Sequence, residues 1–316
     1  MQYRRLGRAG LKVSAIGVGT NQFGGKVNAK GVANILDAAR EAGVNFIDTA
    51  DVYQGGKSEE TIGAAVKGYR DRILIGTKVR HLVDPKGPND GGTSRHHIMQ
   101  GVEASLKRLQ TDYIDLYQIH RWDEEAPIDE TMRALDDLVR AGKVRYIGAS
   151  NFTGWQLTHA NAVAEMAGWE CFVSIQPHYH MFERGIEQEL IPACEYFDIG
   201  ILPYFPLAGG FLTGKYEQGK DAPAGSRGES SPYVQKYMMD ENYAVLDKLS
   251  AFAKEREHTL NELAHAWLLA QPQVSSVISG ATKVEHVVAN AKAGDWVLSL
   301  EEADAVTAIL DGDEAE

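Results

Sequence analysis

Short apolar segments alternate along this chain with longer segments in which apolar residues recur every three or four positions. The short segments are nearly continuous runs of apolar and β-branched residues, as is typical of parallel strands covered on both faces. Segments of this kind lie at 15–18, 45–48, 73–77, 114–118, 145–149, 172–176, 200–204 and 274–279. The pattern predicts eight parallel strands.

The longer segments predict helices with one buried face. Residues 32–42 carry apolar side chains at a helical spacing and are followed by Gly43, a common helix stop. Segments 94–109 and 129–141 repeat the pattern. Alternating strands and helices indicate right-handed βαβ units, and eight such units close into a (β/α)8 barrel of the α/β class. We predict a single domain over residues 1–316; a doubly wound sheet is the structural alternative.

Three segments stand outside the alternation. Residues 2–6 and 12–14 flank a glycine-containing turn and predict an N-terminal β-hairpin that plugs one end of the barrel. An insertion over 207–273 separates the last two strands, and its part 219–232, rich in glycine, serine and charge, predicts a mobile lid. From Ser299 the chain reads Ser-Leu-Glu-Glu, a capping box that predicts a C-terminal helix.

Composition narrows the class of protein. The chain has 316 residues, 44% of them hydrophobic, and a formal net charge of −12. A nucleic-acid surface needs clustered lysine and arginine, so we expect no nucleic-acid partner. Two cysteines, no signal-peptide core and no apolar run of about 18 residues predict a cytoplasmic protein without a membrane partner. The sequence leaves an oligomer possible but gives it no support.

Ionisable residues follow three neighbouring predicted strands at the point where each strand ends. Asp48 ends the second strand and Tyr53 lies on the loop after it, whereas Lys78 and His120 follow the third and fourth strands. In a (β/α)8 barrel the carboxyl ends of the strands carry the chemistry. One such residue alone is usually a helix cap or a structural residue. Together, the four favour an active site.

The chemistry of these side chains suits reduction of a carbonyl group. Hydride addition to the carbonyl carbon leaves negative charge on the oxygen, which then needs a proton donor. The phenol of Tyr53 has an ordinary pKa of about 10, and a neighbouring Lys78 ammonium would lower it. Asp48 would hold Lys78 by ion pairing. His120 would orient the substrate oxygen.

Residues 43–53, GVNFIDTADVY, and 58–63, SEETIG, resemble the signature of the aldo-keto reductase family. The resemblance extends from Leu6 to about Asn290. It implies a (β/α)8 barrel that reduces small-molecule aldehydes or ketones to alcohols. It also implies a catalytic tetrad with Tyr53 as the proton donor: Asp48, Tyr53, Lys78 and His120.

The same resemblance implies an NADPH/NADP+ site. Ser150, Asn151 and Gln176 would bind the nicotinamide carboxamide, and Tyr204 would stack on its ring. Lys283, at a predicted helix start, would bind the 2′-phosphate and favours NADPH over NADH, which remains possible. The implied cofactor residues are Gly19, Thr20, Asp48, Ser150, Asn151, Gln176, Tyr204, Phe205, Pro206, Leu207, Gly209, Gly210, Lys215, Gly280, Thr282, Lys283, His286 and Asn290.

The substrate pocket implied by the resemblance contains Asn21, Tyr53, His120 and Trp122. Asn21 stands where the family often has tryptophan, which predicts a more polar or more open pocket. We expect Trp122 to supply the aromatic wall instead.

An NADPH-binding, redox-sensing regulatory subunit similar to potassium-channel β subunits is the main alternative, although we see no added N-terminal segment of the kind such subunits carry. A metal-dependent hydrolase is disfavoured, since no HExxH spacing occurs and we interpret His178 and His180 as loop residues, so no metal is expected. No GxGxxG follows a strand, which disfavours a Rossmann dehydrogenase.

Overall fold

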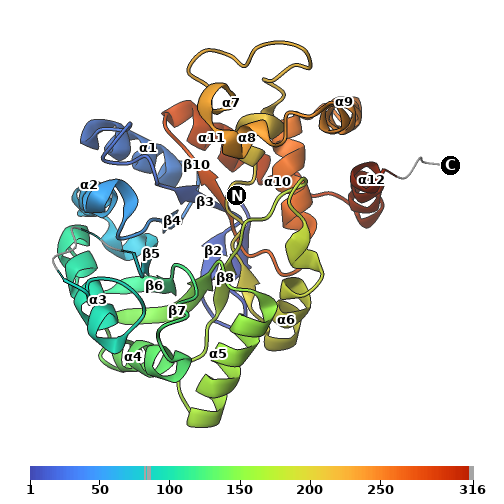
Figure 1. The fold of residues 1–316 in the computed structure, drawn as a ribbon. Helices are drawn as coiled ribbons and strands as arrows, with labels where there is room; N and C mark the ends of the chain where they lie inside the picture. Colours follow the sequence, from blue (N-terminus) through green and yellow to red (C-terminus); the bar gives the residue numbers. More distant parts are fainter. Residues whose placement is uncertain (82, 84–86, 313–316) are drawn as a thin grey trace.

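Eight parallel strands form a ring with helices outside it, which confirms the predicted (β/α)8 barrel (Figure 1). The structure is a computed structural model that describes residues 1–81, 83 and 87–312. The strands of the ring are β3 (Ile16–Gly19), β4 (Phe46–Asp48), β5 (Leu74–Val79), β6 (Ile114–Ile119), β7 (Val144–Ser150), β8 (Ser174–Gln176), β9 (Gly200–Ile201) and β10 (Val277–Gly280). All eight overlap the predicted segments.

The ring closes between β9 and β10. Strand order runs β10-β3-β4-β5-β6-β7-β8-β9, and isolated bridges join Ile201 to Val274 and Tyr204 to Ile278. The Ile278 N–H donates to the carbonyl of Pro203 at 2.9 Å. β9 is shorter than predicted because only its first residues pair regularly. The closed ring excludes the doubly wound sheet.

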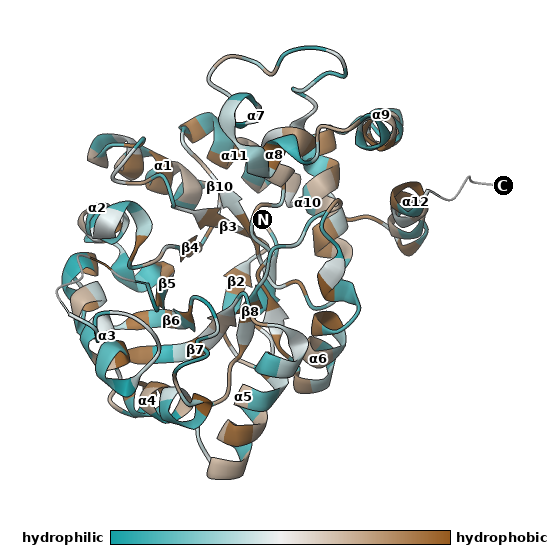
Figure 2. Cartoon of the chain, viewed as in Figure 1, coloured by the Kyte–Doolittle hydropathy of each residue, from teal (hydrophilic) through white to brown (hydrophobic). Residues whose placement is uncertain are grey.

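Outer helices cover the ring, and hydrophilic and hydrophobic residues alternate along them (Figure 2). They are α1 (Ala29–Glu41), α2 (Lys57–Val66), α3 (Arg95–Leu109), α4 (Ile128–Arg140), α5 (Gly154–Ala167), α6 (Leu190–Phe197), α10 (Leu260–Ala270) and α11 (Val284–Ala293). The structure agrees with the predicted start of α3 and the predicted end of α1. Ser94 caps α3 by accepting from the His97 N–H, and Gly43 follows α1 with φ +81°. Short η turns lie at Tyr53–Gly56 (η1), Arg70–Arg72 (η2), Gly185–Glu187 (η3) and Ala208–Thr213 (η4).

The N-terminal hairpin seals the amino end of the barrel. β1 (Tyr3–Arg5) and β2 (Lys12–Ser14) pair antiparallel, as predicted. Leu6 and Val13 are fully buried in one apolar cluster with ring residues such as Phe46 and Leu116. This cluster leaves the carboxyl ends of the strands, at the other end of the ring, to carry polar groups.

The insertion before β10 contains more helix than the sequence suggested. It forms α7 (Arg227–Ser230), α8 (Pro232–Gln235) and α9 (Asp240–Glu255) before α10. The expectation of a loop over 219–232 is therefore wrong for its second half. The cause is a nonlocal contact: the Gly228 N–H donates to the Tyr216 hydroxyl at 2.9 Å and anchors α7.

The C-terminal helix α12 (Leu300–Asp311) begins with the predicted capping box and packs against α9 and α10. Its Ser299 hydroxyl accepts from the Glu302 N–H at 3.1 Å. Within the described residues, no helix combines the length and apolar character needed to cross a bilayer. Cys171 and Cys194 are buried free thiols.

Candidate active site

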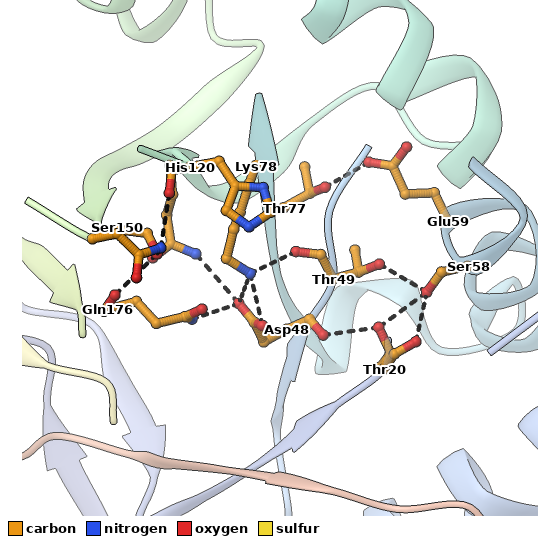
Figure 3. A network of polar contacts seen from close by, with 12 residues as sticks. Thr20, Asp48, Thr49, Ser58, Glu59, Thr77, Lys78, His120, Ser150 and Gln176 are labelled. Atoms are coloured by element: carbon orange, nitrogen blue, oxygen red, sulfur yellow. Dashed lines mark hydrogen bonds and ion pairs between the residues drawn. The ribbon is translucent and has the colours of Figure 1, made fainter. Parts of the chain in front are cut away.

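A buried ion pair lies at the ends of β4 and β5. The Lys78 ammonium donates to both carboxylate oxygens of Asp48 at 2.7 Å and to the carbonyl of Thr49 at 2.8 Å (Figure 3). The Lys78 side chain is 0% exposed. Burial alone would lower the pKa of Lys78, but Asp48 and the nearby Tyr53 raise it above its ordinary value. Lys78 is therefore a fixed positive charge at neutral pH.

Two glutamine side chains complete the environment of Asp48. The amide of Gln176 donates to Asp48 Oδ1 at 2.8 Å, and that of Gln118 donates to the same oxygen at 3.3 Å. The sequence reasoning missed Gln118. Its place two positions before His120 was the available signal, because alternate residues of a strand share a face.

Tyr53 stands on the η1 turn, directly above this pair. The Lys78 ammonium lies 5.3 Å from the centre of its ring. Burial raises the pKa of Tyr53, and the neighbouring Lys78 charge, which lowers it, does not outweigh burial. The predicted lowering of this pKa by Lys78 is present, but it is smaller than the effect of desolvating the phenol, so the pKa of Tyr53 is raised overall. A raised pKa keeps the phenol protonated, as an acid requires.

His120 faces Tyr53 from the end of β6. The two ring centres are 6.0 Å apart, with the rings nearly perpendicular. Burial, followed by the charge of Lys78 and by His81, lowers the pKa of His120 to about 2. Its Nδ1 is buried and has no hydrogen-bond partner among the described residues. His120 is thus a neutral imidazole with hydrogen-bonding capacity to spare.

A hydrogen-bonded layer behind the tetrad fixes the strand ends. Ser58 contacts the hydroxyls of Thr20 and Thr49 at 3.0 and 2.9 Å (Figure 3). Glu59, fully buried, accepts from Thr77 at 2.5 Å and from Arg108 at 2.6 Å. Both Ser58 and Glu59 belong to the family-like signature, yet no role was predicted for them. Glu59 ties α2 to β5, the strand that carries Lys78, and Ser58 ties α2 to the residues that follow β3 and β4.

A second polar chain runs along the ends of β7, β8 and β9. The Tyr204 hydroxyl donates to Asn151 Oδ1 at 2.9 Å, and Asn151 Nδ2 donates to the carbonyl of His120 at 3.0 Å. Ser150 Oγ donates to the carbonyl of Gln176 at 2.9 Å. Asn151 has φ +55°, a left-handed conformation that asparagine tolerates better than most residues. The chain links the tetrad to Tyr204.

These groups open onto a cavity of about 840 Å³, within the usual size range of small-molecule sites. Most of the predicted cofactor and substrate residues line it. They are Gly19, Thr20, Asn21, Asp48, Tyr53, His120, Ser150, Asn151, Gln176, Tyr204, Phe205, Pro206, Leu207, Gly209, Gly210, Lys215, Gly280, Thr282, His286 and Asn290.

Three predicted site residues do not line this cavity: Trp122, Lys283 and Lys78, which is buried behind Asp48. The ring of Trp122 packs edge-on against Phe152 and Trp155, with centres 5.3 and 5.4 Å away. It therefore lies outside the cavity lining, where an aromatic wall was expected, and packs against one ring of the β7–α5 connection and one ring of α5. Lys283 is exposed and directly precedes α11, and its side chain makes no capping hydrogen bond.

The end of the cavity formed by β9 and β10 is rich in positive charge. Besides Lys215, it includes Lys26 and Arg227, neither of which was predicted. Burial lowers the pKa of His286, and the charges of Lys283, Lys215 and Lys26 lower it further. These ammonium groups therefore gather around one imidazole.

Glycines shape the same end. Gly210 has φ +107°, and a Cβ there would meet Lys215 Nζ at 2.6 Å. The lysine end could shift to admit a Cβ, so it is the left-handed backbone of Gly210 that favours glycine here. The cavity also contains a buried Asn261 Oδ1 without a hydrogen-bond partner among the described residues.

Residues 15–311 match the aldo/keto reductase family. The chain belongs to this family. The match confirms the resemblance read from the signature residues, and it places the chain among oxidoreductases.

Relatives of this aldo/keto reductase carry two kinds of name. A probable voltage-gated potassium channel subunit beta from Oryza sativa subsp. japonica is 38% identical, over 98% of this chain and 97% of the relative. The versiconal hemiacetal acetate reductase of Aspergillus parasiticus is 34% identical, over 92% of both chains. The aldo-keto reductase YhdN of Bacillus subtilis is 35% identical, over 98% of this chain and 94% of the relative.

Proposed function

We propose that the protein is an NADPH-dependent reductase of aldehydes or ketones in which Tyr53 is the proton donor. The observation that carries the proposal is the meeting of a protonated phenol and a neutral imidazole at one wall of the cavity. Behind them lies a fully buried ammonium, that of Lys78, paired with Asp48.

The cavity residues fit a dinucleotide phosphate. Lys26, Lys215 and Arg227 supply positive charge, and Gly209 and Gly210, with φ +67° and +107°, allow close backbone approach. Lys283 at the start of α11 adds charge where a helix end favours anions. We therefore propose NADPH as the preferred cofactor, with NADH less favoured.

When bound, the nicotinamide supplies a hydride to the carbonyl carbon. The substrate oxygen is held by hydrogen bonds from the Tyr53 hydroxyl and the His120 imidazole, and it gains negative charge as the hydride arrives. Tyr53 passes its proton to this oxygen, so carbonyl, hydride and proton yield an alcohol. Lys78 stabilises the resulting phenolate, and Asp48 keeps Lys78 charged and in place.

Tyr53→Phe tests the proposed acid directly. We expect turnover to fall by about two to four orders of magnitude, because only the proton donor is removed, while NADPH binding persists. Turnover is followed by NADPH absorbance with aromatic aldehydes and dicarbonyls, and binding by cofactor fluorescence. Tyr196→Phe, at a ring that is 83% exposed, is the control. Full activity in Tyr53→Phe would exclude this role.

Lys283→Ala tests the cofactor preference. We expect the KM for NADPH to rise about tenfold, since a charged phosphate contact is lost, with little change for NADH. Lys12→Ala, an exposed lysine of β2 at the sealed end, is the matched control. Equal changes for both cofactors would remove the case for a 2′-phosphate contact.

A second candidate function is that of an NADPH-binding, redox-sensing regulatory subunit. The names of the rice relative and of an Arabidopsis thaliana relative, 40% identical over 94% of this chain, favour it. Tight NADPH binding together with negligible reduction across the aldehyde panel would support this function over the reductase.

A further inference from the structure

Basic side chains follow the two strand ends that supply Lys78 and His120. Arg80 and His81 come directly after β5, and Arg121 comes directly after His120. We propose that these three residues recognise an anionic group, a carboxylate or a phosphate monoester, on the carbonyl substrate. The proposal rests on the reductase function and names the class of substrate for the same site.

His81 lies against a residue of the tetrad. Its ring packs edge-on against that of His120, with centres 4.6 Å apart, and His120 lines the cavity. His81 therefore contacts His120, the residue proposed to bind the substrate oxygen. A small substrate could therefore place its anionic group at His81 while its carbonyl group is at His120.

Arg80 has an unusual backbone conformation and a side-chain donor without a partner among the described residues. Its φ is +149°, outside the usual range of a residue with a side chain, and the Gly92 N–H donates to its carbonyl at 2.8 Å. Its Nε is buried and has no hydrogen-bond partner among the described residues. Strained backbone persists where surrounding contacts enforce it, often at ligand sites. A bound anion would satisfy the free donor.

The positive charges of Arg80 and Arg121 affect the same ionisable groups at the carboxyl end of the barrel. Burial, and then Arg80 and Arg121, lower the pKa of His81, and both arginines also lower that of His120. Arg121 further opposes the burial that raises the pKa of Tyr204, which follows β9. Arg121 itself is exposed and directly follows His120 at the end of β6.

Among the described residues, neither Arg80 nor Arg121 has an ion-pair partner. The nearby Asp123 is occupied, since its carboxylate accepts from the Thr93 N–H at 2.7 Å and from the Glu125 N–H at 3.2 Å. Asp51, buried beneath the rim, accepts from the Val52 N–H at 2.6 Å. In a chain of net charge −12, unpaired basic groups at the mouth favour an anionic substrate.

The cofactor phosphates do not account for these residues. Their proposed site lies at β9 and β10, whereas Arg80, His81 and Arg121 follow β5 and β6. In the ring, β6 is four strands away from β10, on the opposite side. The two basic regions therefore lie on opposite sides of the ring: one lines the cavity, and the other lies outside the lining, next to His120.

The test compares matched aldehydes with and without the anion. We expect kcat/KM for 4-carboxybenzaldehyde to exceed that for 4-nitrobenzaldehyde about tenfold at low salt, and the ratio to fall with salt. A second pair, 4-formylphenyl phosphate and 4-methoxybenzaldehyde, shows whether phosphate is preferred to carboxylate. Arg121→Gln and Arg80→Gln should each bring the ratios towards one. Arg133→Gln, an exposed arginine of α4, is the control and should leave them unchanged.

Binding supplies a readout that does not need turnover. Calorimetric titration of 4-(hydroxymethyl)benzoate into the NADP+-loaded protein should show binding that Arg121→Gln weakens about tenfold. Equal binding in both proteins, or a wild-type preference for the neutral aldehydes, would overturn the anion site. Loss of all reduction with binding intact would instead count against the reductase function alone.

Discussion

Asp51 shows how one residue near the site makes stability depend on pH. Its side chain is 3% exposed. Burial, and then the charge of Glu59, raise its pKa to about 7. An ordinary aspartate loses its proton near pH 4 in the unfolded chain. Between about pH 4 and 7 the folded protein thus binds more protons, so the free energy of unfolding falls as pH rises through this window.

Asp51→Asn should remove this dependence. The amide keeps an oxygen that accepts from the Val52 N–H but carries no charge to desolvate. We expect the variant to gain stability over the wild type as pH rises from about 4 to 7, by up to about 4 kcal/mol at 1.36 kcal/mol per unit of pKa. Urea unfolding at several pH values measures it. Asp247→Asn, at an exposed position of α9, is the control; a gain independent of pH would refute the explanation.

At the scale of elements, the strand ends were predictable because their pattern is local. The positions of Asp48, Lys78 and His120 follow directly from where each apolar run stops. The orientation of Trp122 and the anchoring of α7 by Tyr216 were not predictable, since both depend on contacts with distant segments. The net pKa of Tyr53 depends on the same kind of information, namely how deeply the fold buries the phenol.

The insertion element α8 is linked to the site by an aromatic cluster. The hydroxyl of Tyr233 lies 3.0 Å from His178 Nδ1. His178 in turn stacks on Tyr204, with ring centres 5.3 Å apart and planes 15° from parallel. A nearby ion pair, between Lys236 and Glu183 at 2.9 Å, holds the residue that follows α8 to the loop after β8. The position of α8 is therefore coupled to the ring of Tyr204.

Tyr233→Phe should loosen this link while keeping the aromatic ring. The loss of one hydrogen bond, about 1 kcal/mol, should speed NADPH dissociation about fivefold with a smaller effect on turnover. Stopped-flow fluorescence of bound NADPH measures the rate. Tyr3→Phe is the matched control, because its hydroxyl also makes one hydrogen bond, to the Gly43 carbonyl, but in the N-terminal hairpin. An unchanged dissociation rate would show that α8 does not restrain the cofactor.

For the whole molecule, the two ends of the barrel have separate tasks. The hairpin closes the amino end with apolar side chains, and the polar groups gather at the carboxyl end. The hairpin turn also contacts the backbone between α6 and β9: the Arg8 N–H donates to the carbonyl of Asp198, the C-cap residue of α6, at 2.6 Å. A defect at the sealed end should therefore lower stability without altering the chemistry at the other end.

Two glycines of the same turn provide the test. Gly7 has φ +53°, and a Cβ there would lie 2.5 Å from the Gly200 nitrogen and the Val173 oxygen, so backbone must move. Gly10 has no atom within 4 Å of such a Cβ. We expect Gly7→Ala to cost about 1–3 kcal/mol and Gly10→Ala to be neutral or slightly stabilising. Thermal unfolding measures both, and kcat should stay unchanged in each. Equal melting temperatures for the two variants would mean that the hairpin does not brace the ring, and a fall in kcat for Gly7→Ala would mean that the two ends are coupled.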